Sequence, residues 1–276
     1  MAVSTDTLER AVYAALAEDV GEGDVTTDAL VDEETTGTAT LSLREPGVVS
    51  GLRAAQIVFA ALDPDVQFEA LVEDGALVEA PREVALVSGS LRAILTGERT
   101  ALNFLGRLSG IATLTHRYVD AVDGTGVAIL DTRKTTPGLR ALEKYAVACG
   151  GGRNHRFGLD DAVLVKDNHL RASGSIGEAV DQVRAATDLS VEVECDTLDQ
   201  VREALDVGVE AVLLDNMSLD ELRRAVSLVQ GRARLEASGG VTLETVRAIA
   251  ETGVDEISVG AMTHSARSLD VSLELR

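Results

Sequence analysis

Charged side chains gather where short apolar runs of this sequence end. One run leads into Asp-Thr-Arg-Lys at 131–134, and another leads into Lys-Asp-Asn-His at 166–169. Later runs end at Glu194 and Asp215. Arginine and lysine bind carboxylates and phosphates, whereas isolated carboxylates bind Mg²⁺ or sugar hydroxyls. These residue types predict a pocket for a small, highly anionic ligand.

The cations are conspicuous because the chain as a whole is acidic, with 25 Lys+Arg against 46 Asp+Glu and a net charge of −21. Cations outnumber carboxylates between residues 131 and 169, and all the lysines of the chain lie there. Arg140 and Lys144 have helical i, i+4 spacing, which favours a solvated helix face. The cations that end apolar runs favour ligand binding instead, and these are Arg133, Lys134 and Lys166.

Glycine turns end the last two apolar runs, at Ser238-Gly239-Gly240 and at Val259-Gly260-Ala261. Glycine turns that lead into helices expose backbone N–H groups, which bind phosphate. His155 and Arg156 follow a glycine-rich stretch and are further candidates for ligand binding.

The two isolated carboxylates have alternative interpretations. Glu194 and Asp215 are either structural caps or ligands of Mg²⁺ and sugar hydroxyls, and we favour the ligands. Glu192 shares the strand face of Glu194 but lies deeper, so its role stays open.

The elements that carry these residues alternate. After residue 126, short apolar strands are predicted at 127–133, 162–169, 191–196, 211–216, 234–240 and 256–262. Helical patterns separate the later ones, at 175–187, 197–208, 218–231 and 242–253. Such alternation predicts a parallel sheet. Because the strands end in polar residues and lack a GxGxxG fingerprint, we predict a β/α barrel, in which the strand ends form one catalytic mouth.

The opening third is predicted to be mixed α/β with antiparallel strands. Helices are expected at 4–20 and 52–62, and a loop is expected at 21–30. Strands are expected at 36–44, 66–78 and 82–90, with a strand or turn at 46–51. Asp74-Gly75 is expected to join the strands of the 66–78 and 82–90 region as a hairpin turn.

Residues 91–122 are helical in pattern but contain Gly97, Gly106 and Gly110, which predicts two or three packed helices with a domain boundary near 107–110. Gly106 and Gly110 would let another helix approach closely. Arg99 lies on one helical face with Asn103 and Arg107.

Composition excludes several classes. The acidity argues against nucleic-acid binding, which needs clustered cations over a broad face. No apolar run is long enough to span a membrane, and the acidic opening does not resemble a signal peptide, so a cytoplasmic protein is expected. Cys149 and Cys195 are expected to be reduced and apolar in character. Acidic residues with arginine in place of lysine suggest adaptation to molar salt.

The motifs, taken in order, resemble those of the quinolinate phosphoribosyltransferase family (nicotinate-nucleotide pyrophosphorylase, carboxylating). They are EDVGEGDVTT, GERTALNFLGRLSGIAT, DTRKTTPGLRALEKYAVACGGGRNHRFGLDD, LVKDNH, VEVE, LLDN and EASGG. The resemblance covers nearly the whole chain. It implies an N-terminal α/β sandwich at 1–108, joined by the C-terminal tail 265–276, and an open, incomplete TIM-like α/β barrel at 109–264.

The resemblance also implies an activity and a site. Mg²⁺-dependent transfer of phosphoribosyl from phosphoribosyl pyrophosphate to quinolinate would give nicotinate mononucleotide, CO₂ and pyrophosphate. Lys134, Glu194 and Asp215 would be catalytic, and Glu194 and Asp215 would also hold the metal. A homodimer is implied, with Arg99 contributed by the partner subunit, while assembly beyond the dimer is left open. The implied substrate-binding residues are Arg99, Thr132, Arg133, Lys134, His155, Arg156, Lys166, Glu194, Asp215, Ser238, Gly239, Gly240, Val259, Gly260 and Ala261.

Four other functions compete with this one. A nicotinate phosphoribosyltransferase binds one carboxylate and releases no CO₂, and a paralogue associated with molybdate transport shares the family motifs. A class I aldolase would use a barrel lysine as a Schiff base, and a non-catalytic barrel would only bind anions. The cation cluster favours a dicarboxylate substrate over these alternatives.

Overall fold

The computed structural model describes residues 3–276. By its internal contacts the chain groups into two compact units. The first comprises Met1–His116, Thr135–Gly151 and Met262–Arg276, and the second comprises Arg117–Lys134 and Gly152–Ala261. The contacts thus assign 135–151 to the first unit, an assignment for which the sequence carries no local signal.

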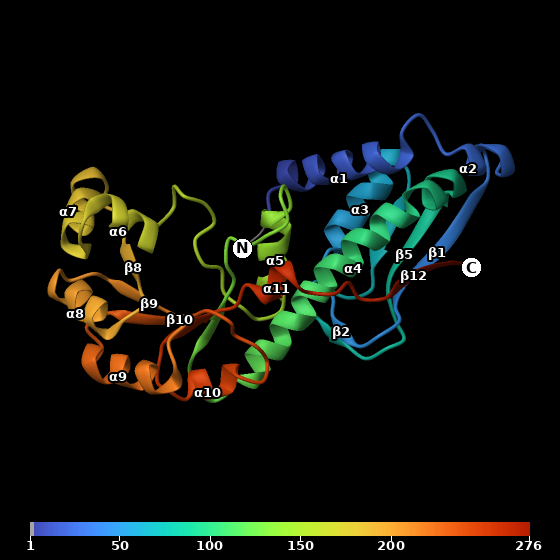
Figure 1. The fold of residues 1–276 in the computed structure, drawn as a ribbon. Helices are drawn as coiled ribbons and strands as arrows, with labels where there is room; N and C mark the ends of the chain where they lie inside the picture. The colour runs from blue at the N-terminus through green and yellow to red at the C-terminus, as the bar shows by residue number, and fades with distance from the viewer. Residues whose placement is uncertain (1–2) are drawn as a thin grey trace. The chain divides into compact units, whose positions relative to one another are not determined.

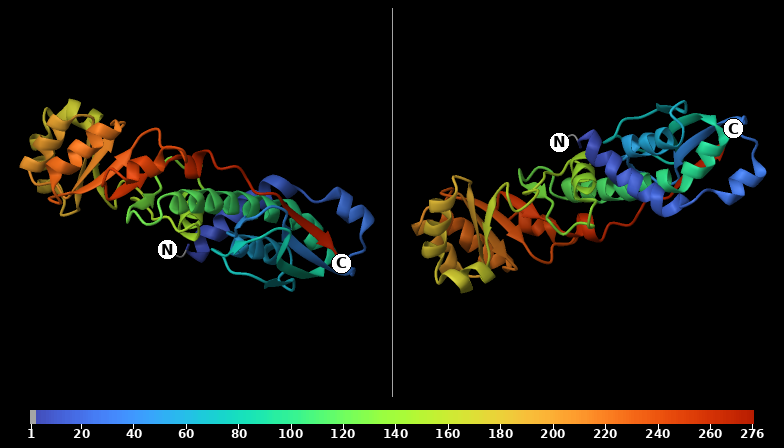
Figure 2. Two further views of the ribbon diagram at one scale, coloured as in Figure 1. Left: turned by 90° about the horizontal axis from the view of Figure 1, so that it is seen from below. Right: turned by 90° about the horizontal axis from the view of Figure 1, so that it is seen from above.

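The first unit is built on a four-stranded antiparallel sheet (Figure 1). Its strand order is β12-β1-β5-β3, with β1 at Thr36–Leu43, β3 at Gln67–Ala70, β5 at Arg82–Ser90 and β12 at Val271–Leu275. The strands expected at 36–44 and 82–90 are confirmed. Because β12 pairs with β1, the end of the chain lies beside an early strand, as the red and blue ribbons of Figure 2 show.

A second, two-stranded sheet corrects one sequence expectation. β2 (Gly47–Val48) pairs with β4 (Leu77–Val78), so Asp74-Gly75 does not join two strands of a hairpin. Instead, the Asp74 carboxylate accepts the backbone N–H of Leu52 at 3.1 Å. Leu52 begins a helix whose N-cap is Gly51, which has no side chain to offer, and Asp74 therefore supplies the cap.

The helices α1 (Thr5–Val20) and α3 (Leu52–Leu62) confirm two predictions. The loop expected at 21–30 is wrong, because α2 (Val25–Leu30) forms there. Asp24 caps α2 by accepting the amide of Thr27 at 3.0 Å, and an aspartate before a short helix is a local signal that also fits a loop.

The glycine-containing stretch forms one continuous helix, α4 (Leu91–Ala121), and the prediction of two or three helices is wrong. The predicted boundary at 107–110 consequently falls inside a helix. Close approach at the glycines is confirmed, but the neighbour is an extended segment. A Cβ on Gly106 would lie 2.9 Å from the carbonyl oxygen of Leu269, and one on Gly110 would lie 2.0 Å from that of Arg267.

The basic helix α5 (Arg140–Cys149) was expected to present a solvated face, and this is wrong for Lys144, which is 2% exposed. Its neighbour Glu143 is fully buried and accepts hydrogen bonds from Arg107 at 2.8 Å and from the amide of Thr136 at 3.0 Å. Packing against the first unit therefore overrides the charge pattern of this helix.

The second unit contains the six expected strands in one parallel sheet, ordered β6-β11-β10-β9-β8-β7. Since β6 and β7 form its two edges, the barrel is open, as the resemblance implied. The strands are β6 (Ala128–Leu130), β7 (Val163–Val165), β8 (Val191–Cys195), β9 (Ala211–Asp215), β10 (Arg234–Ser238) and β11 (Glu256–Ser258).

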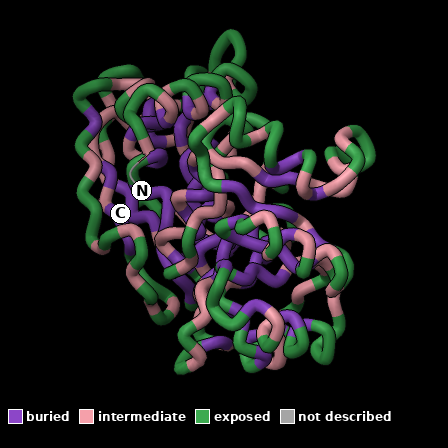
Figure 3. The backbone as a smooth tube through the Cα atoms, turned by 90° about the vertical axis from the view of Figure 1, so that its left-hand side faces the viewer, coloured by how far each residue is buried: buried purple, intermediate pink, exposed green. Residues whose placement is uncertain are grey.

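Helices follow the strands and bury their apolar faces. Three of the four predicted helices are confirmed over nearly their full length, whereas the one predicted at 242–253 is helical only at 246–250. Capping boxes at Thr197 and Ser218 begin two of them. Buried segments (purple) lie toward the inside and exposed ones (green) on the outer turns in Figure 3. The helices after β7 are α6 (Asp167–Ser173), α7 (Ile176–Ala186), α8 (Leu198–Asp206), α9 (Leu219–Val229), α10 (Val246–Ala250) and α11 (Ala261–His264).

Within residues 3–276, no helix combines the length and apolarity that a membrane span requires.

Both cysteines are unpaired thiols, and we predict that neither reacts in the folded protein. Burial raises the pKa of Cys149, and burial together with nearby carboxylates raises the pKa of Cys195 to about 12. Because the thiolate is the nucleophile, iodoacetamide at pH 8 should leave both unmodified until urea unfolds the chain. Rapid labelling of the folded protein, read by mass spectrometry, would contradict this.

Candidate active site

A cavity of about 410 Å³ lies at the carboxyl ends of the second unit's strands. It combines cations, carboxylates and serines, and the sequence predicts such cations and carboxylates for a small, highly anionic ligand. It is lined by Thr132, Arg133, Lys134, His155, Arg156, Leu164, Lys166, Glu194, Leu213, Asp215, Glu236, Ser238 and Ser258.

The cations reach this cavity from three segments. Arg133 and Lys134 follow β6, and the amide of Lys134 donates to the Thr132 hydroxyl at 3.0 Å, which fixes the turn. Arg156 comes from the loop before β7, where its guanidinium donates to the carbonyl of Ala162 at 3.1 Å. Burial, and then the positive charge of Arg133, lower the pKa of Arg156. An anion bound beside these two guanidinium groups would relieve their mutual repulsion.

The two predicted carboxylates stand on neighbouring strands. Glu194 of β8 forms an ion pair with Lys166, which follows β7. Asp215 ends β9 and accepts the side-chain amide of Asn216 at 2.7 Å. Both line the cavity.

Asp131, which the sequence placed beside the cations, has a different task. It is fully buried and accepts the Asn154 side chain at 2.6 Å and the backbone N–H of His155 at 2.9 Å. The backbone of Arg153 adds bonds to β6, because its amide donates to Ile129 and its carbonyl accepts from Asp131. Asp131 thus fastens the loop that presents Arg156.

The His155 ring lies against two buried carboxylates. Its Nε2 is 3.1 Å from an oxygen of Glu192 and 3.3 Å from an oxygen of Glu236, and its Nδ1 accepts the amide of Arg156 at 2.7 Å. Burial alone would lower the pKa of His155, but Glu192 and Glu236 outweigh it and raise the pKa to about 10. The Arg156 amide on Nδ1 opposes this rise, because a second proton on Nδ1 would break that hydrogen bond. The contacts in the structure correspond to a ring with its single proton on Nε2.

The glycine turns are only partly as expected. Gly239 has φ +98°, and a Cβ there would lie 2.2 Å from the Asn216 side-chain oxygen, so glycine is required. The expectation that Ser238-Gly239-Gly240 leads straight into a helix is wrong, because α10 begins only at Val246. Any phosphate contact here would come from the turn and not from a helix N-terminus.

Some predicted residues lie outside the cavity lining. Arg99 is exposed on α4 in the first unit. The amide of Val259 donates to the Leu130 carbonyl at 2.8 Å, within the sheet. Gly239, Gly240 and Gly260 follow β10 and β11, and Ala261 begins α11; none of these four lines the cavity in the described structure.

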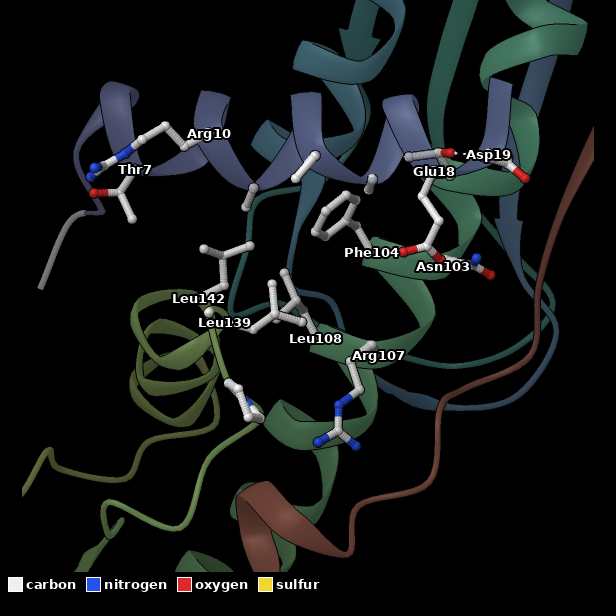
Figure 4. Close-up of a pocket in the computed structure, with 16 residues that line it drawn as sticks. Thr7, Arg10, Glu18, Asp19, Asn103, Phe104, Arg107, Leu108, Leu139 and Leu142 are labelled. Carbon is white, nitrogen blue, oxygen red and sulfur yellow. Dashed lines mark hydrogen bonds between the residues drawn. The ribbon is translucent and has the colours of Figure 1, made fainter. Parts of the chain in front are cut away.

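A larger cavity, about 670 Å³, lies in the first unit between α1, α4 and the segment before α5 (Figure 4). Its walls include Phe104, Leu108 and Leu142, while Arg107 at its edge is engaged by Glu143. Its charged lining residues balance, because Glu18 and Asp19 offset Arg10 and Arg107, so this cavity offers a multiply anionic substrate no excess of cations. The smaller cavity of the second unit therefore remains the candidate active site.

Family models match both parts of the chain. The quinolinate phosphoribosyl transferase N-terminal domain matches residues 24–109, and the C-terminal domain matches residues 111–274. The chain belongs to the quinolinate phosphoribosyltransferase family.

Individual relatives agree with this assignment. The chain is 47% identical to a probable nicotinate-nucleotide pyrophosphorylase [carboxylating] of Synechocystis, over 94% of this chain and 90% of that protein. It is 46% identical to the Mycobacterium leprae nicotinate-nucleotide pyrophosphorylase [carboxylating], over 98% and 96%. The structure of the nicotinate-nucleotide pyrophosphorylase from Francisella tularensis superposes with a TM-score of 0.96 at 41% identity, covering 100% of this chain and 98% of that one.

Three residues in or beside the cavity of the second unit have no role that the sequence alone predicts: Asp131, Glu236 and Ser258. Each lies in or just after an otherwise apolar strand. Strand alternation was the available signal, because Glu236 shares a face with Ser238 two residues later. His155, which contacts Glu236, is distant in sequence, so no local pattern indicates this contact.

Proposed function

We propose that this chain catalyses the Mg²⁺-dependent transfer of phosphoribosyl to quinolinate with decarboxylation, in NAD biosynthesis. The products are nicotinate mononucleotide, CO₂ and pyrophosphate. The observation that carries the proposal is the meeting of four cations with the two strand-end carboxylates in one cavity of a quinolinate phosphoribosyltransferase family member. The cations are Arg133, Lys134, Arg156 and Lys166, and the carboxylates are Glu194 and Asp215.

Charge complementarity supports the choice of substrates. Quinolinate carries two carboxylates and phosphoribosyl pyrophosphate several more negative charges, so both need cations in a partly dry cavity. Arg133, Arg156 and Lys134 would hold the quinolinate carboxylates, with His155 beside them. Lys166 would share the phosphates. The turn at 238–240, together with Gly260 and Ala261, would receive the 5′-phosphate through backbone N–H groups, since the Val259 amide already donates to Leu130.

The carboxylates fit a magnesium ion. Mg²⁺ prefers oxygen ligands and is commonly held by one or two carboxylates together with substrate phosphates. Glu194 and Asp215 offer such oxygens from adjacent strands, and both also suit ribose hydroxyls. When bound, Mg²⁺ neutralises charge on the departing pyrophosphate.

The chain's own residues then support the bond changes. As the bond from sugar C1 to pyrophosphate breaks, positive charge develops on the sugar, near Glu194 and Asp215, and the pyridine nitrogen bonds to C1. The ribosylated nitrogen is cationic and stabilises the carbanion formed when the adjacent carboxylate leaves as CO₂, after which a proton takes its place. No protein nucleophile is required, so Lys134 and Lys166 act as charges and not as Schiff bases.

A homodimer is part of the proposal, with Arg99 of one subunit completing the site of the other. Its exposure on α4 is compatible with that role. Arg99→Ala and Lys134→Ala chains should each be inactive alone. Mixed and reassembled, they should regain about a quarter of wild-type activity, because half the dimers are mixed and each has one intact site. Absence of recovery in mixed dimers confirmed by mass spectrometry would remove Arg99 from the partner's site.

Comparative turnover tests the function. With phosphoribosyl pyrophosphate and Mg²⁺, quinolinate should give nicotinate mononucleotide while nicotinate gives none. Turnover of nicotinate alone would identify the non-decarboxylating transferase, and inactivity with both would favour the molybdate-associated paralogue. A carbonyl substrate trapped on a lysine by borohydride would indicate aldolase chemistry.

The assay should be run in low and in molar KCl. We propose that the acidic surface adapts the protein to concentrated cytoplasmic salt, and activity should then be higher in molar KCl.

A further inference from the structure

The interior of the open barrel holds more carboxylate than the proposed reaction uses. Glu192 on β8 is 5% exposed and Glu236 on β10 is fully buried, and both point at the Nε2 atom of His155. One oxygen of Glu236 accepts the Ser258 hydroxyl. The second oxygen of Glu192 is buried without a hydrogen-bond partner in the described structure. A buried carboxylate that is not fully paired costs stability, which favours a functional reason for keeping it.

The contacts form a chain that leads from these carboxylates to the cations of the cavity. Since the amide of Arg156 donates to Nδ1, the ring proton lies on Nε2, between Glu192 and Glu236. The ring therefore connects the barrel interior to the backbone of Arg156. The same loop is fastened at its other side by Asp131, through the amide of His155.

We propose that Glu192 and Glu236 are positioning residues for the carboxylated substrate, acting through the His155 ring to fix Arg156. This inference rests on the proposed function, because it assigns the two carboxylates to the recognition of quinolinate. A metal ion is the competing occupant, since His155, Glu192 and Glu236 offer ligand atoms within 4.8 Å of one another. The proton required on Nε2 argues against it, because a metal would have to displace that proton.

Glu256 provides a matched control. It lies on β11 directly beside Glu236 of β10, and the negative charges of Glu236 and Glu192 add to burial in raising the pKa of its carboxylate. Its ion-pair partner is Arg234, at 2.7 Å, and not His155. Glu256→Gln therefore removes a neighbouring charge without touching the His155 contacts.

Steady-state kinetics of the full-length protein should separate the roles. Glu192→Gln and Glu236→Gln should each raise the KM for quinolinate about tenfold, with the KM for phosphoribosyl pyrophosphate and kcat changed about twofold or less. Glu256→Gln should leave the quinolinate KM unchanged. A general loss of structure would instead lower the active fraction and leave both KM values as they are.

A double-mutant cycle tests whether the carboxylates act through His155. In a His155→Asn background, Glu192→Gln should raise the quinolinate KM no further, because the connecting ring is already gone. Effects that add in full, or variants with unchanged KM, would overturn the inference. Inactivity of the wild-type protein with quinolinate would reject the proposed function itself, so the two failures differ.

Nuclear magnetic resonance reports which nitrogen of the His155 ring carries a proton, and it needs no substrate. The chain has 4 histidines, so ¹⁵N-histidine labelling gives few signals, and His155→Asn identifies the one concerned. His155 should show a protonated Nε2 that becomes mixed between tautomers in the Glu192→Gln/Glu236→Gln variant. An Nε2 without a proton, or a stoichiometric metal lost on Glu192→Gln, would overturn the positioning role.

Discussion

Replacing Lys134 by alanine should lower kcat/KM for quinolinate about 100-fold or more. Lys134 lines the cavity beside Arg133, and its ammonium would pair with a substrate carboxylate in a site shielded from bulk water. Removing one partner of such a pair leaves the other charge unmatched, which costs more than the pair itself contributes. Initial rates at varied quinolinate, with saturating phosphoribosyl pyrophosphate, give the value.

The matched control is Arg171→Ala, which removes an exposed cation of α6 that pairs with Asp167 on the protein surface. Its kinetics should be those of the wild type. Circular dichroism and the unfolding midpoint should be the same for both variants. If Lys134→Ala also kept wild-type kcat/KM, Lys134 would not belong to the substrate site.

Loss of either carboxylate of the proposed Mg²⁺ site is the second large effect that we expect. Glu194→Gln and Asp215→Asn should each lower kcat about 100- to 1,000-fold, because both carboxylates would face the charge that develops on the sugar and would hold Mg²⁺. The Mg²⁺ concentration for half-maximal rate should rise in both variants. Glu194→Gln also releases Lys166 from its ion pair.

Asp199→Asn, at an exposed carboxylate of α8, controls for the change in net charge. A Mg²⁺ requirement that stays unchanged in both active-site variants would exclude these residues as metal ligands. A rate that survives EDTA in the wild type would exclude the metal requirement altogether.

The barrel could be predicted because local sequence patterns indicate its strands and helices. Apolar runs that end in polar residues, such as the one ending at Asp215, and capping residues such as Ser218 give each element a start and an end. The elements of the first unit are harder to predict from the sequence. α2 is a single short helix that starts from Asp24, and its residues have the composition of a loop.

Tertiary packing explains the remaining errors of fold. Gly106 and Gly110 have the sequence appearance of helix breaks, yet they are accommodated within α4 because an extended segment far along the chain lies against them. Lys144 has the appearance of a surface residue, yet its helix is enclosed by the first unit. In both cases the deciding neighbour is distant in sequence, so no local pattern could indicate it.

The residues of the candidate site also differ in whether a local sequence pattern indicates them. Residues at strand ends, such as Arg133 and Glu194, were visible because polar residues stand out after apolar runs. Glu236 lies inside a strand, and the contact that gives it meaning, with His155, joins residues from different parts of the barrel. Sequence reasoning therefore found the charged groups at the strand ends that line the cavity, and it missed the buried Glu236 that contacts His155.

Quinolinate labelled with ¹⁴C in the carboxylate next to the ring nitrogen tests the central claim most directly. Incubated with phosphoribosyl pyrophosphate and Mg²⁺, the protein should release one labelled CO₂ for each nicotinate mononucleotide and each pyrophosphate formed, and none without phosphoribosyl pyrophosphate. Nucleotide formed without labelled CO₂, or CO₂ released without nucleotide, would contradict the account.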